Sequence, residues 1–224
     1  MQAAFQPLRA VIFDVDGVLC DSEPFIGEAA IRMFEVQHGI RVKIEDFLPF
    51  VGAGENRYLG GVAEKYGIPF DIEADKRFTY DTYLEIIRGR LKPLPGASDF
   101  IRHCRSLGLK LAVATSADRR KLDGNLREIG LPETLFDAAV NGMDVERRKP
   151  HPDLFLLAAK KLGIPPALCL VVEDAPNGIQ AAKAAGSRCL GLTTTFPAAQ
   201  LEEAGADWIA PDLAHVPAGL PMQV

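Results

Sequence analysis

The chain has 224 residues, of which 48% are hydrophobic and 25% charged, and its net charge at pH 7 is −5. This composition is that of a globular protein, and the acidic balance excludes the basic surface that nucleic-acid binding requires. No apolar run approaches the ~20 residues that a membrane span needs, and residues 1–9 lack the pattern of a signal peptide. We therefore expect neither nucleic acid nor a membrane as a partner.

The first predicted element is a strand over residues 9–13. A block with helical spacing and no strand pattern follows and ends at a cluster of breakers, Lys92-Pro93-Leu94-Pro95-Gly96. We interpret residues 21–93 as a helical cap domain that is inserted between the two parts of a core, residues 1–20 and residues 94–224.

Beyond this block, a glycine ends four amphipathic segments, and an apolar run follows each of them. The glycines are Gly108, Gly130, Gly163 and Gly186, each with a basic residue one to three positions before it. Basic residues in a last helical turn and a glycine after it are typical of helix ends. A repeated order of helix, glycine and strand predicts an α/β fold, with a Rossmann-like parallel sheet as the core and an inserted α-helical cap.

Polar residues follow the predicted strands at the point where each strand ends. In chain order they are Asp14 and Asp16, Thr115 and Ser116, Lys149, and Glu173 and Asp174. Each taken alone could be a turn residue, a helix cap or a solvated charge. Because the carboxyl ends of parallel strands meet at one edge of a sheet, we expect all of them to lie close together there.

The chemistry of these side chains suits a phosphate ester. Acidic oxygens are the ligands that Mg²⁺ prefers, whereas a hydroxyl, a lysine and loop N–H groups suit phosphate oxygens. One carboxylate can act as a nucleophile and another as a general acid or base. The set therefore predicts a Mg²⁺-dependent reaction on a small-molecule phosphate ester.

The four segments resemble, in order and spacing, the four motifs of the haloacid dehalogenase superfamily, and the similarity covers nearly the whole chain. The helical block is similar to the small cap of the branch that contains β-phosphoglucomutase, phosphoglycolate phosphatase and pseudouridine-5′-phosphatase. A DxDG sequence alone is a weak signal, whereas four motifs in register are specific. The resemblance implies a phosphoric monoester hydrolase.

The resemblance also implies a role for each matching residue. Asp14 matches the nucleophile that becomes an aspartyl phosphate, and Asp16 matches the general acid and base. Lys149 matches the lysine that binds both the nucleophile and the transferred phosphoryl group. Thr115 matches the hydroxyl that binds phosphate, assisted by the backbone of Ser116.

The metal ligands follow from the same resemblance. Asp14 and Asp174 match direct ligands of Mg²⁺, and the backbone carbonyl of Asp16 matches a third ligand. Glu173 matches a carboxylate that acts on the metal directly or through water.

In this branch the cap supplies much of the specificity, so we expect Glu55, Asn56 and Arg57 to bind the substrate. The mutases typically carry an arginine where this chain has Glu55 and a histidine where it has Ile26. Without the arginine, the chain lacks a side chain that would bind a second phosphate. A mutase needs such a side chain to retain its bisphosphorylated intermediate. These departures favour a phosphatase, with a β-phosphoglucomutase-like phosphomutase as the alternative.

The sequence also bears on two other functions. True haloacid dehalogenation is disfavoured by Asp16, because those enzymes lack the second aspartate. The segment from Phe50 to Ala63 also resembles the haloacid-dehalogenase domain of a plant thylakoid protein, which leaves a regulatory or binding role as a third hypothesis.

The four cysteines, Cys20, Cys104, Cys169 and Cys189, are far apart and form no CxxC pair. Their spacing indicates neither a zinc site nor a redox pair. Unpaired thiols are typical of a reducing compartment, so we expect a cytoplasmic protein. A monomer is the expected state.

Overall fold

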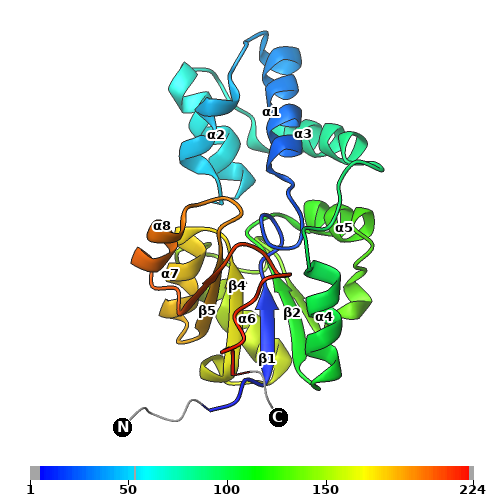
Figure 1. Ribbon diagram of the computed structural model, residues 1–224. Helices are drawn as coiled ribbons and strands as arrows, with labels where there is room; N and C mark the ends of the chain where they lie inside the picture. The colour runs from blue at the N-terminus through cyan, green and yellow to red at the C-terminus, as the bar shows by residue number, and fades with distance from the viewer. Residues whose placement is uncertain (1–5, 53, 222–224) are drawn as a thin grey trace.

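Within the described residues, 6–52 and 54–221, six parallel strands form one sheet in this computed structural model (Figure 1). The strands are β1 (Ala10–Phe13), β2 (Lys110–Ala114), β3 (Ala138–Val140), β4 (Cys169–Glu173), β5 (Arg188–Leu192) and β6 (Trp208–Ala210). Their order is β3-β2-β1-β4-β5-β6, and Val11 of β1 lies between Leu111 and Leu170. The predicted Rossmann-like α/β fold is confirmed.

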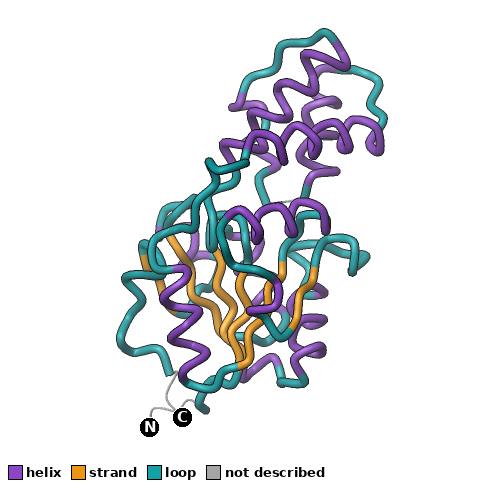
Figure 2. Tube along the Cα trace, turned by 90° about the vertical axis from the view of Figure 1, so that its right-hand side faces the viewer, coloured by secondary structure: helices purple, strands orange, loops and turns teal. Residues whose placement is uncertain are grey.

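Helices cover both faces of this sheet (Figure 2). They are α4 (Ala97–Ser106), α5 (Arg119–Glu128), α6 (Asp153–Leu162), α7 (Pro176–Ala184) and α8 (Ala198–Glu203). Successive side chains of a strand point to opposite faces. Val11 and Phe13 accordingly pack in one apolar cluster with residues of α4 and α5, whereas Ala10 and Ile12 pack in another with residues of α6, α7 and α8. Burial on both faces explains the continuous hydrophobicity of the strands.

Three further helices lie beyond the carboxyl ends of the strands, at the top of Figure 1. These cap helices are α1 (Glu23–His38), α2 (Glu55–Tyr66) and α3 (Ile72–Ile86). Short 3₁₀ turns occur at Ile44–Asp46, Leu48–Phe50, Glu133–Leu135 and Pro166–Leu168. The division of the chain at residues 21–93 stays a prediction, and α1 and α3 lie well inside those limits.

Two neighbouring segments join the cap helices to the rest of the molecule. Cys20 and Pro93 form an antiparallel bridge, and the Leu94 N–H donates to the Leu19 carbonyl at 2.9 Å. The chain therefore leaves the sheet and returns to it at one place. A connection of only two adjacent segments is the arrangement in which a few backbone torsions can move one body against another.

A second contact holds the cap helices against α5. Nζ of Lys76 on α3 lies 2.7 Å from Oδ2 of Asp118, which precedes α5, and both side chains are largely buried. Gly124 on α5 faces Leu84 so closely that a Cβ at this glycine would lie 2.3 Å from a Leu84 methyl carbon. The cap helices are thus packed over the strand ends. None of the helices in the described part of the chain is both long and apolar enough to cross a membrane.

Candidate active site

The ends of β1, β2 and β4 bring the predicted residues to one edge of the sheet, as expected. Asp14 follows β1, and its N–H donates to the Val172 carbonyl of β4 at 3.0 Å. Thr115 follows β2, and its N–H donates to the Val140 carbonyl of β3 at 3.1 Å. Glu173 is the last residue of β4. Backbone hydrogen bonds between neighbouring strands therefore fix where these side chains begin.

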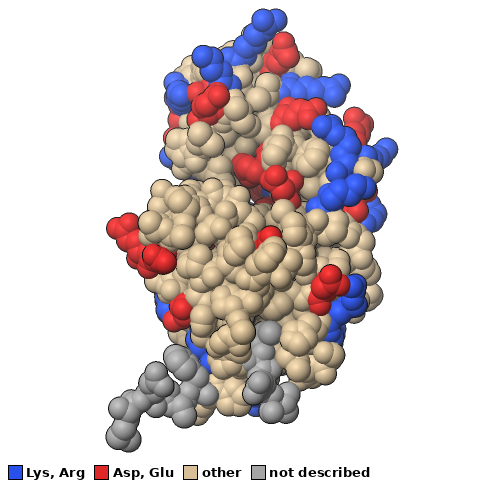
Figure 3. Space-filling model, in the orientation of Figure 1, with Lys and Arg blue, Asp and Glu red and all other residues tan. Residues whose placement is uncertain are grey.

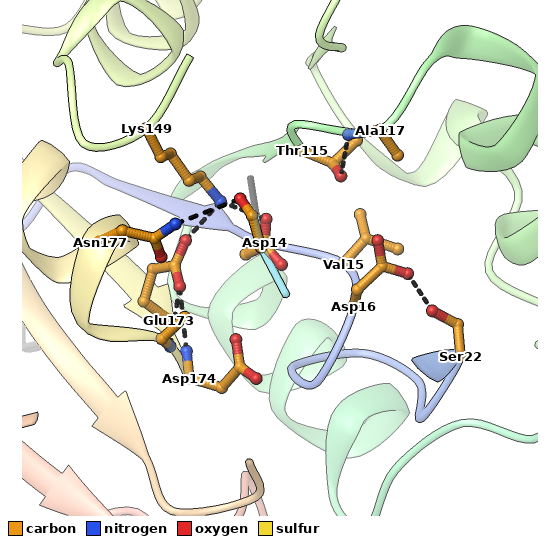
Figure 4. A network of polar contacts seen from close by, with 12 residues as sticks. Asp14, Val15, Asp16, Ser22, Thr115, Ala117, Lys149, Glu173, Asp174 and Asn177 are labelled. Carbon is orange, nitrogen blue, oxygen red and sulfur yellow. Dashed lines mark hydrogen bonds and ion pairs between the residues drawn. The ribbon is translucent and has the colours of Figure 1, made fainter. Parts of the chain in front are cut away.

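Lys149 links two carboxylates at the centre of this edge (Figure 4). Its Nζ contacts Oδ1 of Asp14 and Oε1 of Glu173, and all three side chains are buried. Burial opposes the charge on Lys149, but the two carboxylates outweigh it and raise the pKa of the lysine. The ammonium group therefore stays charged across the range in which enzymes work.

Two buried aspartates here carry raised pKa values. Burial, with Lys149 opposing and Glu173 adding to it, raises the pKa of Asp14 to about 7. Burial and the nearby carboxylates of Glu173 and Asp14 raise the pKa of Asp174 well above its usual range. Carboxylates buried this close together repel one another in their charged forms. A cation in addition to Lys149 would therefore stabilise the charged forms.

The donor atoms at this place fit Mg²⁺. No group of three or more His, Cys, Asp or Glu side chains in the described part of the chain forms a ready-made metal cluster. Mg²⁺ does not need one, because it commonly takes one or two carboxylates and completes its shell with waters and substrate phosphate. The carboxylates of Asp14 and Asp174 and the backbone carbonyl of Asp16 are such a set.

Gly17 shows how tightly the loop after β1 approaches these carboxylates. Its φ is +76°, and a Cβ at this position would lie 1.9 Å from Oδ2 of Asp174. Both the left-handed backbone and the close approach require glycine. The last residue of the DxDG sequence thus makes room for the carboxylate that was expected to bind the metal.

Thr115 and Ser116 line the same cavity as Lys149. Oγ1 of Thr115 accepts a hydrogen bond from the Ala117 N–H at 3.0 Å, which leaves the hydroxyl proton of Thr115 to be donated elsewhere. Oγ of Ser116 is buried and has no hydrogen-bond partner within the described residues, although Ser116 lines the cavity. Both hydroxyls are available to an anion in the cavity.

Asp16 is held by a separate network that the sequence did not reveal. Nζ of Lys121 lies 3.0 Å from Oδ2 of Asp16, Nδ2 of Asn125 donates to Oδ1 at 3.0 Å, and the Ser22 hydroxyl also donates to Oδ1. Lys121 and Asn125 lie one helical turn apart on the buried face of α5. The signal for this network in the sequence is a pair of polar residues one helical turn apart, each next to a leucine.

The three predicted residues of the cap are placed differently from one another. Glu55 is buried and lines the cavity, where its Oε1 lies 3.2 Å from Nζ of Lys121. Asn56 accepts a hydrogen bond from Lys76 at 3.0 Å, and Arg57 pairs with Glu64 at 2.8 Å on the exposed side of α2. Asn56 and Arg57 do not line the cavity, and their contact with a substrate stays a prediction.

One cavity lies between the strand ends and the cap helices, and it is lined by Asp14, Asp16, Glu55, Thr115, Ser116, Lys121, Lys149, Glu173 and Asp174. Its empty volume is about 690 Å³, part of which is open solvent. Figure 3 shows acidic side chains gathered where the cap helices meet the sheet, next to a hollow of the surface.

The family of the chain follows from comparison with known proteins. The model of the haloacid dehalogenase-like hydrolases matches residues 8–186. The chain belongs to this family. The resemblance inferred from the four motifs, and the prediction of a hydrolase, are therefore confirmed.

Relatives within the family agree with this placement. The chain is 34% identical to the phosphorylated carbohydrates phosphatase of Thermotoga maritima, over 89% of this chain and 92% of that protein. It resembles the crystal structure of CbbY from Rhodobacter sphaeroides in complex with phosphate, with a TM-score of 0.80, 28% identity, and coverage of 92% of this chain and 95% of the other. It is also 45% identical to the chloroplastic protein SUPPRESSOR OF QUENCHING 1 of Arabidopsis thaliana, over 93% of this chain but only 20% of that protein.

The network around Asp16 gives a first testable prediction for this family member. We expect Lys121→Met to lower kcat for a phosphate monoester about 10- to 100-fold with little change in KM, because Asp16 loses a buried partner that orients it. Steady-state kinetics would measure this, and Lys121→Arg should recover part of kcat. The matched control is Lys76→Met, which removes the largely buried ion pair between α3 and Asp118 without touching Asp16. An equal loss of kcat in both variants would contradict a positioning role.

Proposed function

We propose that this protein is a Mg²⁺-dependent phosphatase that hydrolyses a small, sugar phosphate-like monoester by way of an aspartyl phosphate on Asp14. The observation that carries this proposal is the separation of the two aspartates of the DxDG sequence. Asp14 contacts Lys149 beside two further carboxylates, whereas Asp16 is bound by Lys121 and Asn125. Different surroundings for two neighbouring carboxylates are what two different catalytic roles require.

In the first step, a carboxylate oxygen of Asp14 attacks phosphorus, and the bond from phosphorus to the leaving oxygen breaks. Protonated Asp16 donates its proton to that oxygen, so the leaving group departs as a neutral alcohol. Lys149 holds the attacking carboxylate and offsets negative charge that builds on the phosphoryl oxygens. The hydroxyl of Thr115 and the backbone of Ser116 hold the same oxygens from the other side.

In the second step, Asp16 accepts a proton from a water molecule that attacks the phosphorus of the aspartyl phosphate. The bond between phosphorus and Asp14 breaks, inorganic phosphate is released, and the free carboxylate of Asp14 is regenerated. One group thus serves as acid and then as base, which returns the enzyme to its starting protonation state.

The carboxylates of Asp14 and Asp174 and the carbonyl of Asp16 would hold the Mg²⁺ ion, with Glu173 acting directly or through water. The ion supplies positive charge that lets an anionic nucleophile approach an anionic phosphate. The raised pKa values of Asp14 and Asp174 support this assignment, because they mark a site that is short of positive charge.

Hydrolysis is supported over phosphoryl transfer between two sugar positions. The cations that line the cavity, within the described residues, are Lys121 and Lys149, and both are bound to carboxylates. A mutase must retain a sugar that carries two phosphates, and among the described residues no unpaired cation lines this cavity to hold the second one. The Thermotoga relative, whose name is that of a phosphatase of phosphorylated carbohydrates, also supports a sugar phosphate-like substrate.

Removal of the metal tests the proposal. We expect p-nitrophenyl phosphate hydrolysis in Mg²⁺ to fall at least about 100-fold in excess EDTA and to return when Mg²⁺ exceeds the chelator. Phosphate release and circular dichroism, measured on the same samples, separate loss of catalysis from loss of fold. Hydrolysis that continues unchanged in EDTA would contradict the metal, and a folded protein without hydrolysis in Mg²⁺ would contradict the phosphatase.

A further inference from the structure

A turn between β5 and α8 reaches the same edge of the sheet, although neither the four sequence motifs nor the proposed chemistry involves it. It consists of Thr193, Thr194 and Thr195, directly after the last residue of β5. Because β5 is parallel to β4, this turn follows a strand end on the same side as Glu173. Thr195 lines the cavity between the strand ends and the cap helices. The turn is therefore placed to act on the site.

Two hydrogen bonds fix this turn. The Thr193 N–H donates to the carbonyl of Ala210, the last residue of β6, at 2.9 Å. The Thr194 hydroxyl donates to the Gly17 carbonyl at 2.5 Å, a contact between residues 177 positions apart in the sequence. The first contact ties the turn to the sheet, and the second ties it to the loop after β1. Together they set where the side chain of Thr195 begins.

Thr195 contacts a carboxylate that is proposed to bind the metal. Its hydroxyl group donates a hydrogen bond to the side chain of Asp174. A Cβ at Gly17 would lie 1.9 Å from Oδ2 of Asp174 and 3.0 Å from Oγ1 of Thr195. The carboxylate, the hydroxyl and the loop after β1 therefore converge at one place.

A hydroxyl group suits a carboxylate that must also bind a cation. Asp14 pairs with Lys149 and Asp16 pairs with Lys121. A lysine orients a carboxylate but also offsets its charge, whereas a neutral hydroxyl orients it and leaves the charge for a metal. A carboxylate has two oxygens that can each accept more than once, so the hydrogen bond from Thr195 leaves positions for the metal.

We infer that Thr195 is a positioning residue for Asp174, and that its hydroxyl group raises the affinity of the site for Mg²⁺. Side chains that orient a metal ligand commonly change metal affinity by about 10- to 100-fold when they are removed. This inference rests on the metal site of the proposed function, and it adds a residue from a segment outside the four motifs. The expected effect is on metal binding and not on the rate once the metal is bound.

Binding of Mn²⁺ to the substrate-free protein tests the inference. Electron paramagnetic resonance measures the free Mn²⁺, and competition with Mg²⁺ gives the Kd of Mg²⁺. We expect Thr195→Val, which keeps the branched shape but lacks the hydroxyl group, to raise both Kd values at least about 10-fold. Thr195→Ser retains the donor and should stay within about 3-fold of the wild type. The control is Thr134→Val, at an exposed threonine of the 3₁₀ turn Glu133–Leu135, which should leave both Kd values unchanged.

Hydrolysis of p-nitrophenyl phosphate gives a second readout. The Mg²⁺ concentration at half-maximal rate should rise in Thr195→Val by the same factor as the Kd of Mg²⁺. At saturating Mg²⁺, kcat and the KM for the ester should change less than about 3-fold. Circular dichroism and thermal unfolding in EDTA show whether each variant is folded without the metal. A lower kcat or a higher KM, with unchanged Kd values, would overturn the inference.

The outcomes distinguish this inference from the proposed function. A folded wild-type protein that binds no Mn²⁺ would contradict the proposed metal site and this inference with it. Binding of Mn²⁺ with the same Kd in the wild type and in folded Thr195→Val would overturn only the role of Thr195. A Kd that rises equally in Thr195→Val and Thr195→Ser would also overturn it, because serine keeps the hydrogen bond.

Discussion

Replacing Asp14 with asparagine is expected to lower kcat for phosphate release at least about 10⁴-fold, the scale on which the loss of a covalent nucleophile falls. The amide keeps nearly the same shape but is a poor nucleophile. It also removes one negative charge from the group that Lys149 and the metal are proposed to neutralise. Steady-state release of phosphate from p-nitrophenyl phosphate and from the best sugar phosphate measures the effect.

The control for this variant is a carboxylate of the same kind outside the cavity. Asp99 lies in the first turn of α4, and its side chain is 81% exposed. Asp99→Asn makes the same change in charge and should leave kcat within about twofold of the wild type. A folded Asp14→Asn variant that keeps a tenth of the wild-type rate would contradict the role of Asp14 as nucleophile.

Replacing Asp16 with asparagine is expected to have the second-largest effect, and its size should depend on the leaving group. For an alkyl or sugar phosphate, whose leaving oxygen must be protonated, we expect kcat to fall about 10²- to 10⁴-fold. For p-nitrophenyl phosphate, the leaving group needs no proton, so the first step should survive while the attack of water slows. Rapid mixing should then show a burst of about one equivalent of nitrophenolate, followed by slow turnover.

The burst and the turnover that follows it test the two roles of Asp16 separately. Equal losses on both kinds of substrate, with no burst, would contradict its role as acid in the first step. Rapid turnover after the burst would contradict its role as base in the second step.

The fold and the edge of the sheet could be predicted because both depend on local patterns. Each strand is an apolar run bounded by a glycine or a polar turn, and parallel pairing then forces the residues after the strands to one side. Asp14 and Glu173, which are 159 positions apart in the sequence, meet at Lys149 for this reason. The strand β6, Trp208–Ala210, was not predicted, because the helix before it, α8, has no basic residue in its last turn and so lacks the helix-end pattern.

The network around Asp16 could not be predicted, because it depends on how separate elements pack. Ser22 comes from the segment before α1, Lys121 and Asn125 come from α5, and Asp16 follows β1, so the network forms only when these separate parts of the chain pack together. From the sequence alone, a lysine in a charged segment is predicted to lie at the surface.

The three substrate-binding residues predicted in the cap show a different limit of sequence reasoning. They lie next to one another at the start of α2, which begins at Glu55. Neighbouring residues on a helix point about 100° apart, so Glu55, Asn56 and Arg57 cannot all face the same cavity. Glu55 lines it, while Arg57 pairs with Glu64 outside.

The measurement that tests the central claim most directly is the detection of the phosphorylated residue itself. The Asp16→Asn variant would be mixed with p-nitrophenyl phosphate and Mg²⁺, quenched in acid within the burst, digested, and examined by mass spectrometry. An aspartyl phosphate predicts one added phosphoryl group on the peptide that contains Asp14, in an amount that matches the burst, and none in the Asp14→Asn variant. A burst of nitrophenolate with an unmodified Asp14 would contradict the proposed mechanism.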